Sequence, residues 1–138
     1  MSDCIFCKIA NGEIPSATIY EDENFRAILD VFPASKGHTL ILPKAHFANL
    51  YDIPEGQVKE AYALAKRVGM AMKETFGCDG LNILQNNEEA AGQTVFHFHI
   101  HVIPRYDEDG VQIKWKPESL SEENKREILG KLQVNLEA

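Results

Sequence analysis

The sequence predicts an α+β domain with a mostly antiparallel, five-stranded sheet, one long helix and a C-terminal helix. Five short segments have the composition of strands, and the first two are separated only by Asp22-Glu23-Asn24, which is typical of a hairpin. One long segment, residues 54–76, carries apolar side chains at helical spacing. Strands in one run, with a single helix among them and another at the end, favour antiparallel pairing. Because 138 residues is the usual size of one domain, we expect a single domain over residues 1–138.

The first half of the chain is predicted to contain a helical turn, three strands and the long helix. The turn covers residues 4–12, and the strands cover residues 17–21, 25–30 and 39–42. Pro54 suits the first turn of the long helix, and Gly77 suits its C-terminal cap. The apolar positions of this helix are predicted core residues: Val58, Ala61, Tyr62, Ala65, Val68, Met70, Met72 and Phe76.

The second half is predicted to contain two strands, a turn and the final helix. The strands cover residues 80–85 and 97–103, the second ended by Pro104, and Asp107-Glu108-Asp109-Gly110 is predicted to be a turn. The final helix covers residues 121–136, with Ser121 as its N-cap. Its apolar side is predicted to carry Ile128, Leu129 and Leu132.

Composition and charge argue against two classes of partner. No apolar run approaches the roughly 20 residues that a membrane-spanning helix needs, so we expect no membrane partner. The N-terminus lacks the basic and apolar regions of a secretory signal, which predicts a cytoplasmic protein. The net charge of -7 argues against nucleic acid, whose phosphates need a basic surface. It does not exclude a phosphorylated small molecule, which backbone N–H groups and a few polar side chains can hold in a cleft.

Three of the five histidines alternate with apolar residues in His97-Phe98-His99-Ile100-His101. A strand points successive side chains to opposite faces, so Phe98 and Ile100 would enter the core while the three imidazoles are displayed together on the other face. Imidazole can act as a nucleophile, acid or base near neutral pH, and it also binds metals. The alternation therefore predicts a reactive or metal-binding surface.

The residues ahead of this strand offer contacts to a ligand. Gly92 would let the backbone approach a ligand closely, and Gln93 and Thr94 offer hydrogen-bond donors. Thr94 has the side-chain parity of the buried face, so only a bend or loop would bring it near the histidines.

The stretch GQTVFHFHIHVIPR, residues 92–105, resembles the signature of the histidine triad (HIT) superfamily of nucleotide hydrolases and transferases. The resemblance extends over nearly the whole chain. IFCKI at residues 5–9 resembles the opening of the family, and DVFP at 30–33 with GHTL at 37–40 resembles its ribose-side and phosphate-side segment. The resemblance implies the HIT-like fold.

The chemistry implied by this resemblance is transfer of a nucleotidyl group to His99. A neutral His99 would attack the α-phosphorus of a purine nucleotide, and water would then release the nucleoside monophosphate from the covalent intermediate. His101, Gln93, Thr94 and nearby backbone N–H groups would stabilise charge on the phosphate oxygens.

The same resemblance assigns the remaining contacts to the substrate. His38 and Asn86 would help to position the α-phosphate and its histidine partners, and Asp30 would hold the ribose hydroxyls. The base pocket would be lined by Phe6, Ile28 and Leu29.

Cys4-x-x-Cys7 is half of a common zinc site. The other half could be His46 and His97, and family members with this cysteine pair bind a structural zinc with the corresponding residues. In that case His97 is a ligand and not an acid. The alternatives are two unpaired thiols or a redox pair, although a redox pair would normally follow a strand in a thioredoxin-like unit. No organic cofactor is expected.

Several alternatives stay open at this point. The three histidines could bind a catalytic metal, or the chain could be a nucleotide-binding adaptor without activity. Within the family, one branch cleaves adenosine phosphoramidates and nucleotidyl-amines and another cleaves dinucleoside polyphosphates; the size and opening segment favour the first. Family members are homodimers in which the long helix and one strand meet across a two-fold axis, so the resemblance also implies a homodimer.

Overall fold

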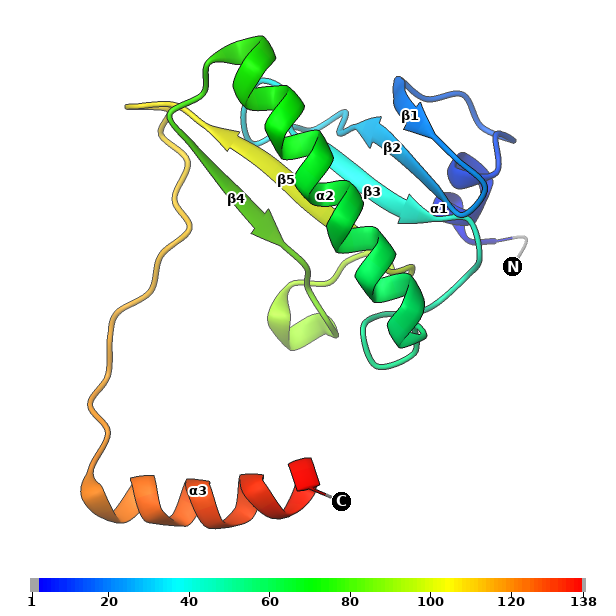
Figure 1. Ribbon diagram of the computed structural model, residues 1–138. Coiled ribbons are helices and arrows are strands. Elements are labelled where there is room, and N and C mark those ends of the chain that lie inside the picture. The colour runs from blue at the N-terminus through cyan, green and yellow to red at the C-terminus, as the bar shows by residue number, and fades with distance from the viewer. Residues whose placement is uncertain (1–2, 138) are drawn as a thin grey trace.

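The computed structural model describes residues 3–137, and its centre is one antiparallel sheet of five strands in the order β1-β2-β3-β5-β4 (Figure 1). The strands are β1 (Thr18–Glu21), β2 (Phe25–Leu29), β3 (Thr39–Pro43), β4 (Gly80–Leu84) and β5 (Ile100–Arg105). Each neighbouring pair is antiparallel. The predicted α+β class and the predicted five-stranded antiparallel sheet are confirmed.

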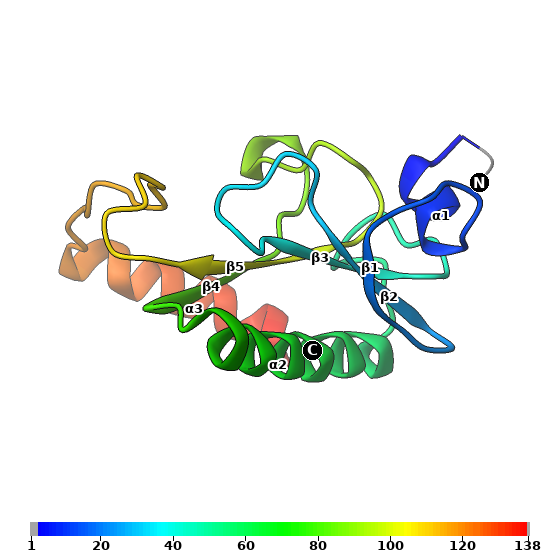
Figure 2. The same cartoon turned by 90° about the horizontal axis from the view of Figure 1, so that it is seen from above.

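Helices cover the two faces of this sheet differently. The long helix α2 (Glu55–Phe76) packs on one face, and the short helix α1 (Ile5–Ala10) lies with several loops on the other (Figure 2). A single 3-10 turn, η1 (Glu89–Ala91), precedes the histidine segment, and α3 (Glu122–Glu137) ends the described chain. No helix within residues 3–137 combines the length and the hydropathy needed to span a membrane.

The core lies between α2 and the sheet. The fully buried side chains include Phe25, Ile41, Phe98, Ile100 and Val102, which meet the inner side of α2. Burying one such side chain stabilises the fold by about 1.5–3 kcal/mol, so this layer fixes α2 on the sheet. The buried positions of α2 are Ala61, Leu64, Ala65, Val68, Gly69 and Met72.

Three predicted core residues of α2 are exposed instead: Tyr62 is 41% exposed, Phe76 is 37% exposed, and Met70 departs most from the prediction. Met70 is 64% exposed, whereas Met72 is buried. The helix presents its apolar side to the sheet over a narrow arc, and Met70 points instead toward the edge beside β4, where it lines an open hollow. The predicted ends of the helix are confirmed: Pro54 is its N-cap, and Gly77 ends it in the left-handed conformation (φ 60°).

The histidine segment is only partly a strand, which corrects the prediction. β5 begins at Ile100 and pairs with β3 only from Ile41↔Ile100 to Thr39↔Val102. His97 lies beyond that pairing, because β3 ends at Pro43 and the chain then turns away. The two-residue alternation nevertheless persists, so Phe98 and Ile100 enter the core. The histidines are not displayed on the surface as expected: His97 and His99 are buried under α1 and the loops.

The chain leaves the sheet at Arg105 through a fixed turn. The Arg105 guanidinium binds both carboxylate oxygens of Asp109, at 2.8 and 3.0 Å, and donates to the carbonyl oxygen of Val111 at 2.7 Å. Beyond this turn, an extended segment leads to α3, which stands apart from the sheet and α2 (Figure 1). Ser121 caps α3 as predicted, with its Oγ accepting from the Asn124 N–H at 3.1 Å.

Candidate active site and metal centre

A cavity of about 440 Å³ opens on the sheet face opposite α2. Seven of the residues predicted to bind or transform substrate line it: Phe6, Ile28, Leu29, Asp30, Thr94, His99 and His101. The bend at residues 95–97 brings Thr94 to the cavity despite its parity. Most of the remaining wall is apolar, and it comes from α1, the segment after it and the loop after β2.

His99 is held in one tautomer by the backbone. Its Nδ1 lies 2.7 Å from the carbonyl oxygen of His97. A carbonyl can only accept, so Nδ1 carries the proton and Nε2 carries the lone pair. Nε2 has no protein partner among the described residues and is accessible from the cavity. Burial lowers the pKa of His99, which keeps this ring neutral near pH 7.

His101 is held in a different way, through His38. The N–H of Ala34 donates to His38 Nδ1 at 2.9 Å, so His38 carries its proton on Nε2. That Nε2 lies 3.0 Å from His101 Nδ1, which therefore accepts, and the proton of His101 is on Nε2. Burial, followed by the nearby His99 and His38, lowers the pKa of His101 to about 4. The cavity thus meets a lone pair on His99 and an N–H donor on His101.

Asp30 supplies the only carboxylate among the described residues that line this cavity. Its Oδ1 accepts from the N–H of Phe32 at 2.9 Å, and its Oδ2 lies 3.5 Å from His38 Nε2. The carboxylate therefore stands beside the two imidazoles at the end of β2. Phe32, whose N–H holds Asp30 in place, is itself 89% exposed at the cavity.

Four predicted residues do not line the cavity: His38, whose Nε2 lies against His101, and Gln93, Gly92 and Asn86. The Gln93 side chain donates to the carbonyl oxygens of Ala48 and Val95 and accepts from the N–H of Glu88, so its amide organises loops. Gly92 adopts φ +95°, and a Cβ there would lie 3.7 Å from Asn86 Nδ2. Gly92 and Asn86 therefore adjoin each other at the loop that leads into the histidine segment.

The four predicted zinc ligands converge around the ring of His97. Ligand atoms of Cys4, Cys7, His46 and His97 all lie within 4.8 Å of one another. The Cys4 and Cys7 sulfurs are 3.4 and 3.5 Å from His97 Nδ1. His97 Nε2 lies 2.8 Å from the carbonyl oxygen of Pro43, so it is protonated and leaves the Nδ1 lone pair for a metal. Two thiols and two imidazoles suit zinc, and these residues could hold it.

The same geometry weighs against the three triad histidines as ligands of one catalytic metal. His97 turns its free lone pair toward the cysteines, and His99 Nδ1 is occupied by a carbonyl. Among the described residues, the second group whose ligand atoms converge is Asp30, His38 and His101. There, the Ala34 N–H on Nδ1 keeps a proton on His38 Nε2, the nitrogen that would have to bind the metal.

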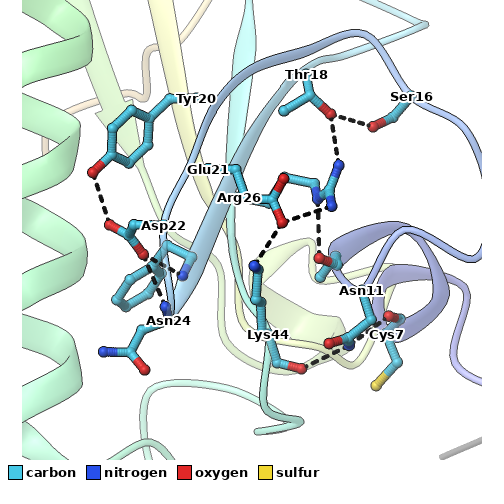
Figure 3. A network of polar contacts seen from close by, with 12 residues as sticks. Cys7, Asn11, Ser16, Thr18, Tyr20, Glu21, Asp22, Asn24, Arg26 and Lys44 are labelled. Carbon is cyan, nitrogen blue, oxygen red and sulfur yellow. Dashed lines mark hydrogen bonds and ion pairs between the residues drawn. The ribbon is translucent and has the colours of Figure 1, made fainter.

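The helix that carries the cysteines is also anchored at its other end (Figure 3). Arg26 on β2 donates from Nε to the carbonyl oxygen of Ala10 at 3.0 Å and from Nη2 to Glu21 at 2.9 Å. Asn11 donates to the carbonyl oxygens of Cys7 and Lys44 at 2.8 and 3.0 Å. These bonds hold α1 against β2 and β3. The ring of Phe6 thereby stands edge-on to His99, with centroids 4.9 Å apart.

Comparison with known proteins decides the family. The family model "HIT domain" matches residues 11–108, which include Asp30, His38 and the three alternating histidines. The chain belongs to the HIT family. The resemblance found in residues 92–105 is confirmed, and so is the HIT fold, which solved HIT-family proteins of Bacillus anthracis and Bacillus subtilis share.

Among HIT proteins, adenosine 5'-monophosphoramidase HNT1 of Saccharomyces cerevisiae is 43% identical over 134 residues, covering 96% of this chain and 80% of that protein. The crystal structure of a Streptococcus mutans UA159 protein superposes with a TM-score of 0.94 at 40% identity, covering 99% of this chain and 87% of that one. The crystal structure of a Zn-bound histidine triad family protein from Mycobacterium smegmatis has a TM-score of 0.77 at 40% identity, covering 97% of this chain and 98% of that one.

Sequence reasoning missed part of the site. It did not include Val31 and Phe32, which line the cavity next to Asp30, or Ile5 and Ile9, which flank Phe6 on α1. Their positions in the DVFP and IFCKI segments were the available signal. Ala34 carried no signal, because it acts through its backbone N–H.

Proposed function

We propose that this HIT protein hydrolyses purine nucleotides at the α-phosphate through a nucleotidyl-His99 intermediate, with a phosphorus–nitrogen bond as the bond that is cleaved. The observation that carries the proposal is the pair of opposite tautomers at one cavity. His99 offers an accessible lone pair on Nε2, and His101 offers an N–H beside it. A nucleophile and a donor at one site are what a two-step phosphoryl-type transfer requires.

In the first step, the Nε2 lone pair of His99 forms a bond to phosphorus and the bond from phosphorus to the leaving amine breaks. The amine takes up a proton from the solvent. The ring becomes a nucleotidyl-imidazolium, and its Nδ1–H stays on the carbonyl oxygen of His97, which favours the positive charge. The N–H of His101 stabilises charge on a non-bridging phosphate oxygen.

In the second step, water adds to phosphorus and the phosphorus–nitrogen bond to His99 breaks. The ring leaves with its electron pair and is neutral again, and the proton lost by water returns to the solvent. The products are a nucleoside monophosphate and the free amine. The net reaction consumes one water and no cofactor.

The cavity walls support a nucleoside as the bound group. Phe6, Ile28 and Leu29 provide apolar surface for a base, and the Asp30 carboxylate provides acceptors for ribose hydroxyls. The relative named adenosine 5'-monophosphoramidase, which covers 96% of this chain, supports a phosphoramidate over a dinucleoside polyphosphate. The net charge of -7 also favours the less charged of these two substrates.

We also propose a structural zinc at Cys4, Cys7, His46 and His97. Burial, reinforced by Cys4, raises the pKa of the Cys7 thiol to about 11, so a bound cation would be needed to hold this sulfur as a thiolate. Zinc would tie the start of α1 to the histidine segment. A cytoplasmic setting, where thiols stay reduced, suits this use of the cysteines.

A homodimer through α2 and β4 completes the proposal. β4 is an edge strand, and an apolar hollow of about 520 Å³ beside it is lined by Tyr62, Met70, Leu81 and Ile83 among others. Exposed apolar surface on an open edge favours association. Sedimentation should give twice the chain mass for the wild type and the single chain mass for Leu81→Arg. A monomeric wild type would contradict this part.

The function is tested by turnover of an adenosine 5'-phosphoramidate beside diadenosine tetraphosphate. We expect faster release of adenosine monophosphate from the phosphoramidate and no detectable release by His99→Ala. Faster cleavage of the dinucleotide would replace the proposed substrate class. Wild-type turnover by His99→Ala would refute the proposed nucleophile.

A further inference from the structure

The loop between β2 and β3, residues 31–37, holds His38 through a backbone donor. It rises over the sheet on the side away from α2 (Figure 2). Its Ala34 N–H donates to His38 Nδ1 at 2.9 Å, and that bond leaves the proton of His38 on Nε2. The Nε2–H donates in turn to His101 Nδ1, 3.0 Å away, so the N–H of His101 faces the cavity. One backbone N–H therefore sets the tautomers of two imidazoles.

This loop, which we call the donor loop, has little packing of its own. Residues 31–34 are all exposed, and Val31 and Phe32 are 80% and 89% exposed. A segment without buried side chains opens at little cost in free energy. Contacts from outside the segment therefore have to hold the Ala34 N–H in place.

Two side-chain hydrogen bonds fasten the end of the donor loop to the end of β5. Ser35 Oγ donates to the carbonyl oxygen of Pro104 at 2.5 Å, and the Tyr106 hydroxyl donates to the carbonyl oxygen of Lys36 at 2.8 Å. Pro104 is fully buried in β5, the strand that also carries His101. We call Ser35 and Tyr106 the loop anchor, because they fix the donor loop relative to the strand of the imidazole that it controls.

A glycine lets the loop approach closely enough for these bonds. Gly37 adopts φ +98°, and a Cβ there would lie 2.7 Å from Phe76 Cε2 and 3.3 Å from Pro104 Cγ. Only glycine fits both this conformation and this space. The ammonium of Lys36 lies 5.4 Å from the centroid of the Phe76 ring, which is a favourable cation–π distance. The end of the donor loop thus rests on β5 and on the last turn of α2.

The loop anchor adjoins the bond that it would protect. Ser35 directly follows Ala34, and its carbonyl oxygen accepts from the His38 N–H at 3.2 Å. A hydrogen bond weakens steeply when its donor turns away, so a small shift of the loop would weaken the contact of Ala34 with His38. Asp30 Oδ2 also lies near His38 Nε2, but at 3.5 Å it is at the limit of hydrogen bonding and holds the tautomer less firmly.

We propose that Ser35 and Tyr106 are positioning residues for His101. By holding the donor loop, they keep the Ala34 N–H on His38 and the His101 N–H directed at the cavity. The proposal rests on the function above, in which this N–H stabilises a phosphate oxygen. Neither residue of the loop anchor lines the cavity, so both act on the substrate indirectly. In the opposite tautomer, His101 would turn a lone pair toward the phosphate and would repel charge there instead of stabilising it.

The tautomers can be measured directly. Protein labelled with 15N-histidine is studied at pH 7.5 by long-range proton–nitrogen NMR, as wild type, Ser35→Ala, Tyr106→Phe and the double variant. In the wild type, we expect protons on Nε2 of His38 and His101 and on Nδ1 of His99. In the double variant, we expect a second tautomer of both His38 and His101, with each single variant between the two. His99 should not change, because a backbone carbonyl outside the donor loop holds it.

Two NMR results would overturn the proposal. One is a double variant in which His38 and His101 keep the tautomers of the wild type, even if its melting temperature is lower, since lost stability alone would show a merely structural role. The other is a change at His99 as large as the change at His38 and His101, because the damage would then be general.

Turnover of an adenosine 5'-phosphoramidate gives the second readout. We expect kcat of the double variant to fall about tenfold, which is part of the roughly 100-fold cost of losing one donor, because a fraction of the molecules keeps the productive tautomer. KM should stay within twofold of the wild type, since the apolar wall of the cavity is unchanged. Tyr51→Phe, which removes a hydroxyl from a side chain that is 77% exposed, should alter neither constant. A kcat within twofold of the wild type, or a rise in KM alone, would overturn the proposal.

The outcomes are separable from those of the proposed function. A shift of the His38 and His101 tautomers in the double variant of a protein without turnover refutes the hydrolase and leaves the loop anchor standing. An active wild type whose double variant keeps both its tautomers and its kcat does the reverse.

Discussion

The Nδ1 of His99 lies 2.7 Å from the backbone carbonyl oxygen of His97, and this bond sets the tautomer of His99. It fixes the His99 lone pair on Nε2, at the cavity. The His97 ring, meanwhile, is fixed by the carbonyl of Pro43 and turns its own lone pair to the cysteines. Neighbouring members of one alternating motif are thereby given different roles, one as candidate nucleophile and one as candidate metal ligand.

Replacement of His101 by alanine is expected to lower kcat about 100-fold, the usual cost of losing one donor to a developing oxyanion. His38 would then lose the acceptor that lies 3.0 Å from its Nε2. Rapid-quench kinetics should show that nucleotidyl-enzyme still forms, but slowly. A kcat within twofold of the wild type would mean that His101 does not face the reacting phosphate.

Replacement of Cys7 by serine is expected to remove the bound zinc and lower the melting temperature by roughly 10 °C, because four-ligand sites contribute folding free energy directly. The matched control is Cys78→Ser, since Cys78 lies outside the ligand group. Metal analysis after purification without chelators should find about one zinc in the wild type and in Cys78→Ser. Retention of a full equivalent by Cys7→Ser would contradict the assigned ligands.

Arg26 is expected to support substrate binding from a distance by holding α1. Arg26→Met keeps the length of the side chain but removes the donors to Ala10, Thr18 and Glu21. We expect KM to rise about fivefold, equivalent to about 1 kcal/mol, with kcat nearly constant and zinc content unchanged. Lys59→Met, an exposed change on α2, should alter neither constant. A fall in kcat with an unchanged KM would show that Arg26 acts on the chemistry instead.

Stability should fall in mild acid in part because of His101. Its neighbours at the cavity are His99, His38 and Asp30, and burial lowers its pKa to about 4 in the folded state. In the unfolded chain its pKa is about 6.5, so the unfolded state binds more protons between these values. The free energy of unfolding contributed by His101 is therefore lost progressively as the pH falls from about 6.5 to about 4.

The measurement is the melting temperature of wild type and His101→Asn at pH 7.5 and pH 5. The variant should lose less stability between the two pH values, because it lacks the ionisable group. An identical or larger loss in the variant would remove His101 as a source of the acid sensitivity.

The parts of the fold that depend on local pattern were predictable. The hairpin at Asp22-Glu23-Asn24 and the caps of α2 follow from residue type, and the alternation of the histidine segment puts Phe98 in the core even where no strand forms. The predictions that failed concern side chains whose burial depends on contacts with residues far away in the sequence. Met70 is exposed because a helical pattern does not show which apolar side faces an open edge.

The candidate site was likewise predictable only in part. The family resemblance pointed to the residues around the cavity, including Asp30 and Phe6, although they are far apart in sequence. The tautomers of His97 and His38 could not be predicted from the sequence, because they are set by the backbone groups of Pro43 and Ala34. The same holds for Gln93, whose amide is taken up by loop carbonyls that no local pattern identifies.

The most direct test of the account is to trap the intermediate. Wild-type protein mixed with an adenosine 5'-phosphoramidate is quenched within the first turnover, and the proteolysed peptides are analysed by mass spectrometry with His99→Ala in parallel. We predict an adenylyl group on the peptide that contains residue 99 of the wild type, located on His99 itself, and none in the variant. An active wild type that shows no adduct at any quench time, or an adduct on another histidine, would contradict the central claim.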